Sequence, residues 1–312
     1  MAAAANFVGR RKTPAFGGRA LAGSVGERSL RFTPRVRVAL AASALLTLVY
    51  TSALHSQTQI PRVEIVPSAA TNSGNDPLRW SGLLLNYAAE MDGHKRHVIC
   101  TAQFIAPRVV LTAAHCVQDF KTGAWYDVDK MYFVLQYSKG SFSDIYRPVC
   151  LSRYDGWFPD TGKSVGEAET TRSALARYQW DYAMILMDHD GPDGFFNSEV
   201  DWKGKYQTAT MIGYPLAPLA DLTVQTARGP LYFPPDRPNV VALVHMNRQD
   251  LTRGTSGGGW MVNIHKESGG QRSGLVSISS YINEQSPGVS FGPYLTSDYN
   301  KLLDYVSNGC PY

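Results

Sequence analysis

Cysteine and net charge are both scarce in this sequence, and each shortage excludes a class of protein. The 312 residues carry a formal net charge of only +4, and 18% of them are charged. No basic stripe stands out downstream of the N-terminus, so the sequence does not predict a nucleic-acid partner. The four cysteines include no C-x-x-C pair, so neither a zinc site nor a thioredoxin-like motif is expected.

The basic residues gather near the N-terminus instead. Eight arginines and lysines share the first 37 residues with one acid, Glu27, and an apolar segment follows at residues 38–54. This arrangement is typical of a secretory signal, with small residues before a cleavage point after Ala53. The alternative is an uncleaved membrane anchor, for which the segment is close to the lower length limit. We therefore expect residues 1–56 to direct export, giving a secreted or periplasmic protein that is membrane-anchored if residues 38–54 stay attached.

The rest of the chain alternates short apolar runs with clusters of Gly, Pro, Asn and Asp, a pattern typical of a β-sandwich or β-barrel. One helix is expected at the end of the chain, where Leu302, Leu303 and Val306 share a face. The stretch 160–179 is polar and aperiodic and is expected to be a surface loop. The expected strands form two series, 98–106, 109–114, 131–137 and 183–187, then 208–214, 240–246, 260–264 and 275–279.

Three short motifs contain the residue types that nucleophilic hydrolysis needs. Thr112-Ala-Ala-His115-Cys116 places a histidine, a general base, at the end of an apolar run. Gly254-Thr-Ser256-Gly-Gly258 provides glycines for a tight turn that exposes a serine hydroxyl and aims backbone N–H groups at an oxyanion. Trp180-Asp181-Tyr182 opens a buried strand with an acid, whose charge needs a partner, and an imidazole supplies one.

The order of these residues along the chain separates two hydrolase folds. The serine motif also satisfies G-x-S-x-G, the nucleophile elbow of α/β-hydrolases. That fold requires an acid and then a histidine after the serine, and only His265 follows Ser256. The order His115, Asp181, Ser256 is instead that of chymotrypsin.

The string from Cys100-Thr-Ala-Gln-Phe-Ile to Val109-Val-Leu-Thr-Ala-Ala-His115-Cys116 resembles trypsin-like serine proteases, and the resemblance extends over residues 98–309. Met211-Ile-Gly-Tyr-Pro215 also resembles the bacterial glutamyl-endopeptidase (V8-like) branch. The resemblance implies an all-β chymotrypsin-like fold, two six-stranded antiparallel barrels with a short C-terminal helix. The protease domain would span residues 57–312, with an N-barrel at about 80–200 and a C-barrel at about 201–312.

The resemblance also implies a function and the residues that perform it. The protein would be a serine endopeptidase acting on proteins or peptides through a triad and an acyl-enzyme, without a cofactor or metal. The backbone N–H groups of Gly254 and Ser256 would form the oxyanion hole. Ser277 would support the triad acid and line the substrate cleft.

The cysteines fit the same resemblance. An even count in an exported chain favours two disulfides, and four cysteines allow three connectivities. In the family a disulfide brackets the histidine loop, which implies Cys100–Cys116 and leaves Cys150 to pair with Cys310.

The substrate preference is left open by the sequence. Asp250 lies six residues before Ser256, where trypsin places the acid that binds a basic P1 side chain, but it also fits a turn. Ser279 is assigned to the same pocket, although it does not match trypsin there. The V8-like resemblance implies an acidic P1 residue instead.

Two further expectations concern activation and activity. Thr255 stands where trypsin-like zymogens carry an Asp that pairs with a newly cut N-terminus, so activation by that ion pair is not expected. The alternative function is a catalytically inactive protease homologue that acts as a binding module. The three intact triad residues argue against that alternative.

Overall fold

The structure is a computed structural model, and it describes residues 7–11, 77–91, 94–120, 122–158, 176–216, 222–245, 253–263, 273–282 and 288–311. The predicted signal or anchor segment at residues 38–54 lies outside the described residues, as does most of the loop expected at 160–179. Residues 1–12 and 65–312 form one unit. In the described part of the chain, no helix is long and apolar enough to cross a membrane.

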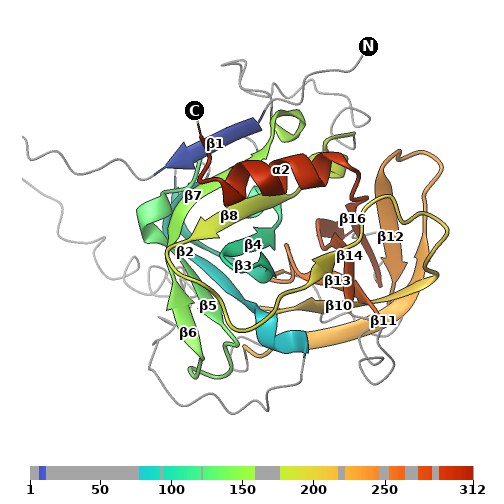
Figure 1. Cartoon of the computed structure of the whole chain (residues 1–312), viewed down its shortest axis with the longest axis horizontal. Coiled ribbons are helices and arrows are strands. Elements are labelled where there is room, and N and C mark those ends of the chain that lie inside the picture. Colours follow the sequence, from blue (N-terminus) through green and yellow to red (C-terminus); the bar gives the residue numbers. More distant parts are fainter. Residues whose placement is uncertain are drawn as a thin grey trace, which may run out of the picture. The chain divides into compact units, whose positions relative to one another are not determined.

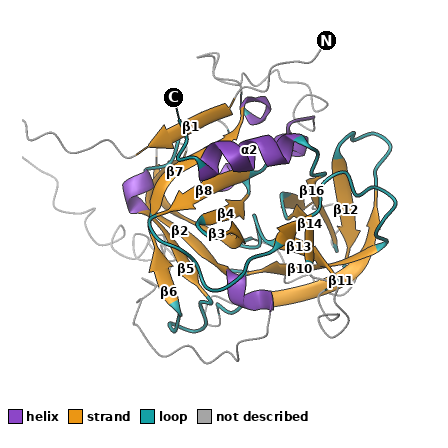
Figure 2. Cartoon of the chain, viewed as in Figure 1, coloured by secondary structure: helices purple, strands orange, loops and turns teal. Residues whose placement is uncertain are grey.

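Strands are the commonest regular element of the described chain (Figure 1), and the helices between them are short (Figure 2). The first eight strands are β1 (Phe7–Arg11), β2 (Ser81–Met91), β3 (His94–Ala106), β4 (Val109–Thr112), β5 (Met131–Leu135), β6 (Asp144–Tyr146), β7 (Pro148–Tyr154) and β8 (Ala183–Met187). The second eight are β9 (Asn197–Ser198), β10 (Thr208–Gly213), β11 (Gln225–Tyr232), β12 (Val240–Val244), β13 (Gly259–Val262), β14 (Gly274–Ile278), β15 (Tyr281–Ile282) and β16 (Val289–Pro293). The helices that the structure describes in full are η1 (Pro77–Trp80), η2 (Ala114–Cys116), η3 (Val128–Lys130), η4 (Asp155–Trp157) and η5 (Tyr178–Trp180), which are 3-10 helices, and the α-helix α2 (Asp298–Ser307).

Each half of the chain forms its own sheet. Strands β1 to β8 make one eight-stranded sheet in the order β1-β7-β8-β4-β3-β2-β5-β6, and strands β9 to β16 make another in the order β15-β16-β12-β11-β10-β13-β14-β9. Among the described strands, only β9 and β14 pair in parallel. The two curled sheets in Figure 1 confirm the predicted all-β architecture. Each sheet has eight strands rather than the six expected, with β1 and β6 at the edges of the first sheet and β15 and β9 at the edges of the second.

Strands β4 and β8 are almost entirely apolar because they are covered on both faces. All four residues of β4 are buried, and β4 lies between β3 and β8 in the first sheet. All five residues of β8 are buried as well. A strand buried on both faces needs apolar side chains at every position rather than at alternate positions. The eight strands expected from the sequence are all present, with some of their ends shifted by a few residues.

The C-terminal helix packs on the first sheet although it follows the second sheet in sequence. Helix α2 begins at Asp298 and lies across β7 and β8 (Figure 1). Its buried residues are Tyr299, Leu302 and Val306, spaced so that they share one face. The C-terminal end of the chain therefore packs on the first sheet, which contains β4 and β8.

The first strand comes from the segment that the sequence assigns to targeting. Strand β1 pairs antiparallel with β7 over five residues, with Gly9 opposite Ser152. A Cβ added to Gly9 would lie 3.1 Å from the carbonyl oxygen of Leu151 and 3.4 Å from the hydroxyl of Tyr305. The backbone of residues 7–11 is thus closely packed against β7 and part of the folded unit.

Candidate active site

The predicted histidine lies in a loop that a disulfide closes. Cys100 in β3 bonds Cys116 at the end of η2, across a separation of 16 residues. His115 precedes Cys116 in η2, and its side chain is 24% exposed. The second disulfide, Cys150–Cys310, joins β7 to the residues after α2. Both predicted pairings are confirmed, and the first limits the positional freedom of the imidazole.

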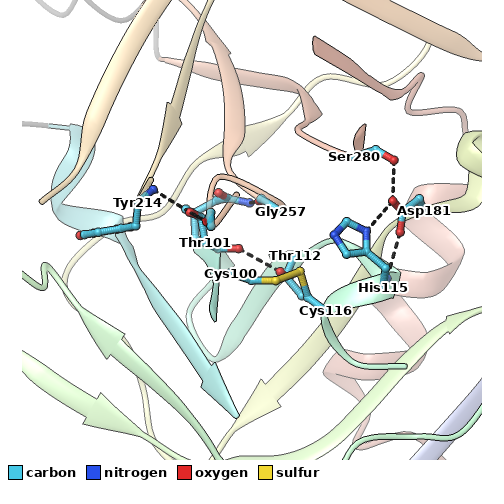
Figure 3. Close-up of a disulfide and its surroundings, with 11 residues drawn as sticks. Cys100, Thr101, Thr112, His115, Cys116, Asp181, Tyr214, Gly257 and Ser280 are labelled. Carbon is cyan, nitrogen blue, oxygen red and sulfur yellow. Dashed lines mark hydrogen bonds and ion pairs between the residues drawn. A yellow bond between two sulfur atoms is a disulfide. The ribbon is translucent and has the colours of Figure 1, made fainter. Parts of the chain in front are cut away.

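His115 and Asp181 are joined by two hydrogen bonds (Figure 3). Asp181 lies between η5 and β8, and its side chain is fully buried. The imidazole Nδ1 is 2.8 Å from Oδ2 of Asp181, and the backbone N–H of His115 donates to Oδ1 at 3.0 Å. Because an ionised carboxylate can only accept, Nδ1 carries the proton of this bond. The Nε2 atom of a neutral imidazole then keeps its lone pair.

A serine completes the hydrogen bonding of Asp181, but at a different position from the one expected. Ser280 Oγ donates to Oδ2 of Asp181 at 2.5 Å. Ser277, the residue expected to support the acid, donates instead to the carbonyl of Pro293 at 2.8 Å and is fully buried. The prediction for Ser277 is therefore corrected. Strand β14 ends at Ile278, and the chain turns before β15 begins. This turn brings the hydroxyl of Ser280, three positions after Ser277, to the carboxylate of Asp181.

The charge of Asp181 sets the direction of the pKa shift of His115. Burial lowers the pKa of the imidazole, but the carboxylate charge and the hydrogen bond to it raise the pKa by more. The pKa of His115 is therefore raised above its ordinary value of 6.5. The fully buried acid stabilises a positive charge on the imidazole, as a general base requires when it accepts a proton.

Ser256 lies in a turn that is held against the strands around His115. Its carbonyl accepts the backbone N–H of Thr101 at 2.8 Å. A Cβ added to the next residue, Gly257, would collide with the hydroxyl of Thr112 and the carbonyl of Thr101. The turn therefore passes close to the end of β4, from which the chain continues to His115. Among the described residues, no hydrogen bond joins the His115 ring to the Ser256 hydroxyl.

The backbone around Ser256 has the conformation that the glycine motif predicts. The φ angle is +91° at Gly254 and +81° at Gly257, in the left-handed region that favours glycine. Within the described part of the chain, the N–H groups of Gly254 and Ser256 have no protein acceptor. Two uncommitted N–H groups on one turn can bind the oxygen anion of a tetrahedral intermediate.

Of the two residues that the sequence assigns to the P1 pocket, the structure describes Ser279, whereas Asp250 lies outside the described residues. Ser279 is only 5% exposed, and its Oγ accepts a hydrogen bond from Trp260 Nε1 at 3.0 Å. The hydroxyl of Ser279 is thus bonded to the buried interior of the second sheet.

Sequence reasoning did not assign the aromatic side chains beside the imidazole to the site. The ring centroids of His115 and Trp157 are 6.4 Å apart, and those of Trp157 and Tyr178 are 6.2 Å apart. Tyr178 in turn packs on Tyr281, with centroids 4.0 Å apart. The position of Tyr178, three residues before Asp181, is the signal that could have identified this row of rings.

One group of potential metal ligands occurs at the site. The ligand atoms of Cys100, His115 and Cys116 lie within 4.8 Å of one another. Both cysteines are in the disulfide, so they provide no thiolate to a metal.

Comparisons with known proteins bear on the family and on the fold. Residues 81–160 match the family model for trypsin. A thermostable serine protease, AL20, from an extremophilic microorganism is 20% identical, with a TM-score of 0.55, over 74% of this chain and 98% of that protein. The protease Anisep from Arthrobacter nicotinovorans is 18% identical, with a TM-score of 0.55, over 76% of this chain and 99% of that protein.

A glutamyl endopeptidase in complex with MPD is 15% identical, with a TM-score of 0.56, over 77% of this chain and 96% of that protein. No curated protein matches the chain in sequence. At these identities the solved structures show the fold, which is chymotrypsin-like, and the specific likeness to the glutamyl-endopeptidase branch stays a prediction. The fold and the trypsin match together support a peptidase of the trypsin-like type.

Proposed function

We propose that this protein is a serine endopeptidase that cleaves peptide bonds in proteins or peptides through His115, Asp181 and Ser256. The observation that carries the proposal is the hydrogen-bonded chain from Ser280 through buried Asp181 to the imidazole. Such a chain fixes the tautomer in which Nε2 can accept a proton. The uncommitted N–H groups at Gly254 and Ser256 support the proposal independently.

In the proposed mechanism, His115 Nε2 takes the proton of the Ser256 hydroxyl while the serine oxygen attacks the carbonyl carbon of the substrate. The C–O π electrons move to the carbonyl oxygen, and the N–H groups of Gly254 and Ser256 bind the resulting anion. The intermediate collapses, the C–N bond breaks, and protonated His115 gives its proton to the leaving amine. Water then attacks the acyl-enzyme, with His115 again as the base. No cofactor takes part in these steps.

We further propose that the protein folds and acts outside the cytoplasm. The two disulfides form in oxidising compartments and are consistent with an extracellular or periplasmic protein. For substrate preference, we propose that Asp250 favours a basic P1 side chain. A library of peptides that differ only at P1, assayed with the wild type and Asp250→Ser, tests this. A wild-type preference for an acidic residue would contradict it.

Labelling with a fluorophosphonate probe tests the proposed activity, with Ser256→Ala as the matched control. We expect the wild type to be labelled and the Ser256→Ala protein to be unlabelled, because only an activated serine attacks the probe at a useful rate. Because the described residues show no hydrogen bond between the His115 ring and the Ser256 hydroxyl, the labelling also tests the other candidate, an inactive homologue that acts as a binding module. A folded wild-type chain that is not labelled would support that candidate and contradict the peptidase.

A further inference from the structure

Thr101 connects the nucleophile turn to the first sheet. It is a fully buried residue of β3, next to the disulfide at Cys100. Its backbone N–H donates to the Ser256 carbonyl at 2.8 Å, and its hydroxyl donates to the Gly254 carbonyl at 2.9 Å. The same hydroxyl accepts the backbone N–H of Tyr214 at 2.9 Å (Figure 3). One side chain thus joins three backbone segments that are far apart in sequence.

The direction of the Thr101 hydroxyl is fixed by its partners. A carbonyl can only accept and a backbone N–H can only donate, so the hydroxyl proton points to Gly254 and the oxygen lone pair to Tyr214. The hydroxyl of Thr112 donates to the Thr101 carbonyl at 2.9 Å, which holds the backbone of Thr101 from the other side. Thr101 also pairs with Leu83 in the ladder between β2 and β3, so the Thr112 bond is one of several that hold its backbone.

The bonds on either side of Gly254 hold both of its peptide planes. The carbonyl of Arg253 accepts the N–H of Leu216 at 2.8 Å. Because the C=O and N–H of a trans peptide point in opposite directions, this bond directs the Gly254 N–H away from Leu216. The following peptide is held through its carbonyl by Thr101. Glycine rotates more freely than any other residue, so these two bonds supply the restraint that Gly254 lacks by itself.

We propose that Thr101 is a positioning residue that keeps the oxyanion site formed in the free protein, a proposal that rests on the proposed peptidase function. Position 255 carries a buried threonine, so no carboxylate there can order the turn by pairing with a cleaved N-terminus. The Thr101 hydroxyl restrains the same turn from a strand that is already in place. Its contribution is preorganisation, because it does not itself contact the oxyanion.

The test compares two substitutions that each remove one fully buried hydroxyl. Thr101→Val deletes the bonds of the hydroxyl to Gly254 and Tyr214 and keeps the backbone N–H, whereas the control Thr112→Val deletes a bond to the Thr101 carbonyl. Turnover is normalised to active sites titrated with the fluorophosphonate, so unfolded molecules are not counted. For Thr101→Val we expect kcat to fall about 10- to 100-fold with KM within about threefold, because the oxyanion exists only in the transition state.

Two further measurements separate positioning from stability. Thr101→Ser keeps the hydroxyl, and we expect it to restore kcat to within about threefold of the wild type. A peptide boronate, which forms a tetrahedral adduct, should bind Thr101→Val more weakly by the same factor as the loss in kcat/KM. If Thr101→Val yields no titratable protein, Thr101→Ala takes its place with the same expectation.

The outcomes distinguish this proposal from the proposed function. An active wild type with unchanged kcat in Thr101→Val overturns the role of Thr101 and leaves the peptidase intact. An equal loss of kcat in Thr112→Val, or no recovery in Thr101→Ser, also overturns that role. An unlabelled wild type overturns both proposals.

Discussion

Replacing Asp181 by Asn changes the hydrogen bonds of the proposed triad without changing its shape. In the wild type one carboxylate oxygen accepts the backbone N–H of His115 at 3.0 Å. The other accepts both Nδ1 of the ring at 2.8 Å and the hydroxyl of Ser280 at 2.5 Å. An amide offers one oxygen and one NH2 group, so only one of these two positions can remain an acceptor.

The two orientations of the amide differ in cost. With the NH2 group toward the backbone N–H of His115, two donors face each other in a fully buried place, and neither can rotate away. With the NH2 group toward the ring, the Ser280 hydroxyl can turn and accept, and Nδ1 can accept once its proton has moved to Nε2. The second orientation is therefore favoured. It places the proton on the atom that must receive the serine proton.

We expect kcat to fall about 10⁴-fold in Asp181→Asn, equivalent to about 5 kcal/mol of transition-state stabilisation. The assay is the hydrolysis of a chromogenic peptide under single-turnover conditions, with thermal unfolding of both proteins as the check on folding. A folded Asp181→Asn protein that retains more than about a tenth of wild-type kcat would refute the assignment of Asp181 as the residue that sets the tautomer.

Two further predictions concern pH and the second disulfide. The profile of kcat/KM should rise with pH and have its midpoint above 6.5, because only neutral His115 can take the serine proton and its pKa is raised; a midpoint at or below 6.5 would count against the coupling to Asp181. The effect on stability has the opposite sign, since protonation favours the folded state. This contribution is complete below pH 6.5 and is lost as pH rises through the raised pKa, which urea unfolding of the wild type and Asp181→Asn across pH would detect. Removing both Cys150 and Cys310 by substitution with Ser should lower the free energy of unfolding by about 2 to 5 kcal/mol, because the bond closes a loop with a sequence separation of 160. An unchanged urea midpoint with an unchanged slope would contradict that prediction.

The parts of the fold that depend on local sequence pattern were predictable. Strands β4 and β8 are apolar runs, interrupted only by Thr112 at the end of β4, and α2 shows three apolar residues on one helical face after Asp298. Such patterns can be read from the sequence because the burial of a strand or helix face requires an apolar side chain at each position on that face. The partner of a hydrogen bond leaves no such pattern in the sequence.

The parts that depend on contacts distant in sequence were not predictable. The bond from Thr101 to Gly254 spans 153 positions, and neither residue carries a local sign of the other. The support of Asp181 by Ser280 rather than Ser277 depends on where β14 ends and β15 begins. The run from Gly274 to Ile282 contains several serines and small residues, so its sequence does not fix that point.

Strand β1 has a consequence for the route that the chain takes through the cell. An export signal or an anchor at residues 38–54 leaves the basic residues before it on the cytoplasmic side of the membrane. The pairing of residues 7–11 with residues 150–154 requires both segments on the same side. The two arrangements therefore exclude each other in any one molecule.

A molecule cut after Ala53 would lack β1 and would present the free edge of β7, with unpaired N–H and C=O groups open to a strand of another chain. In a molecule that keeps β1, residues 7–11 and the strands that follow residue 80 lie in the same compartment. Peptides from residues 1–12 in a digest of the mature protein would identify the second case.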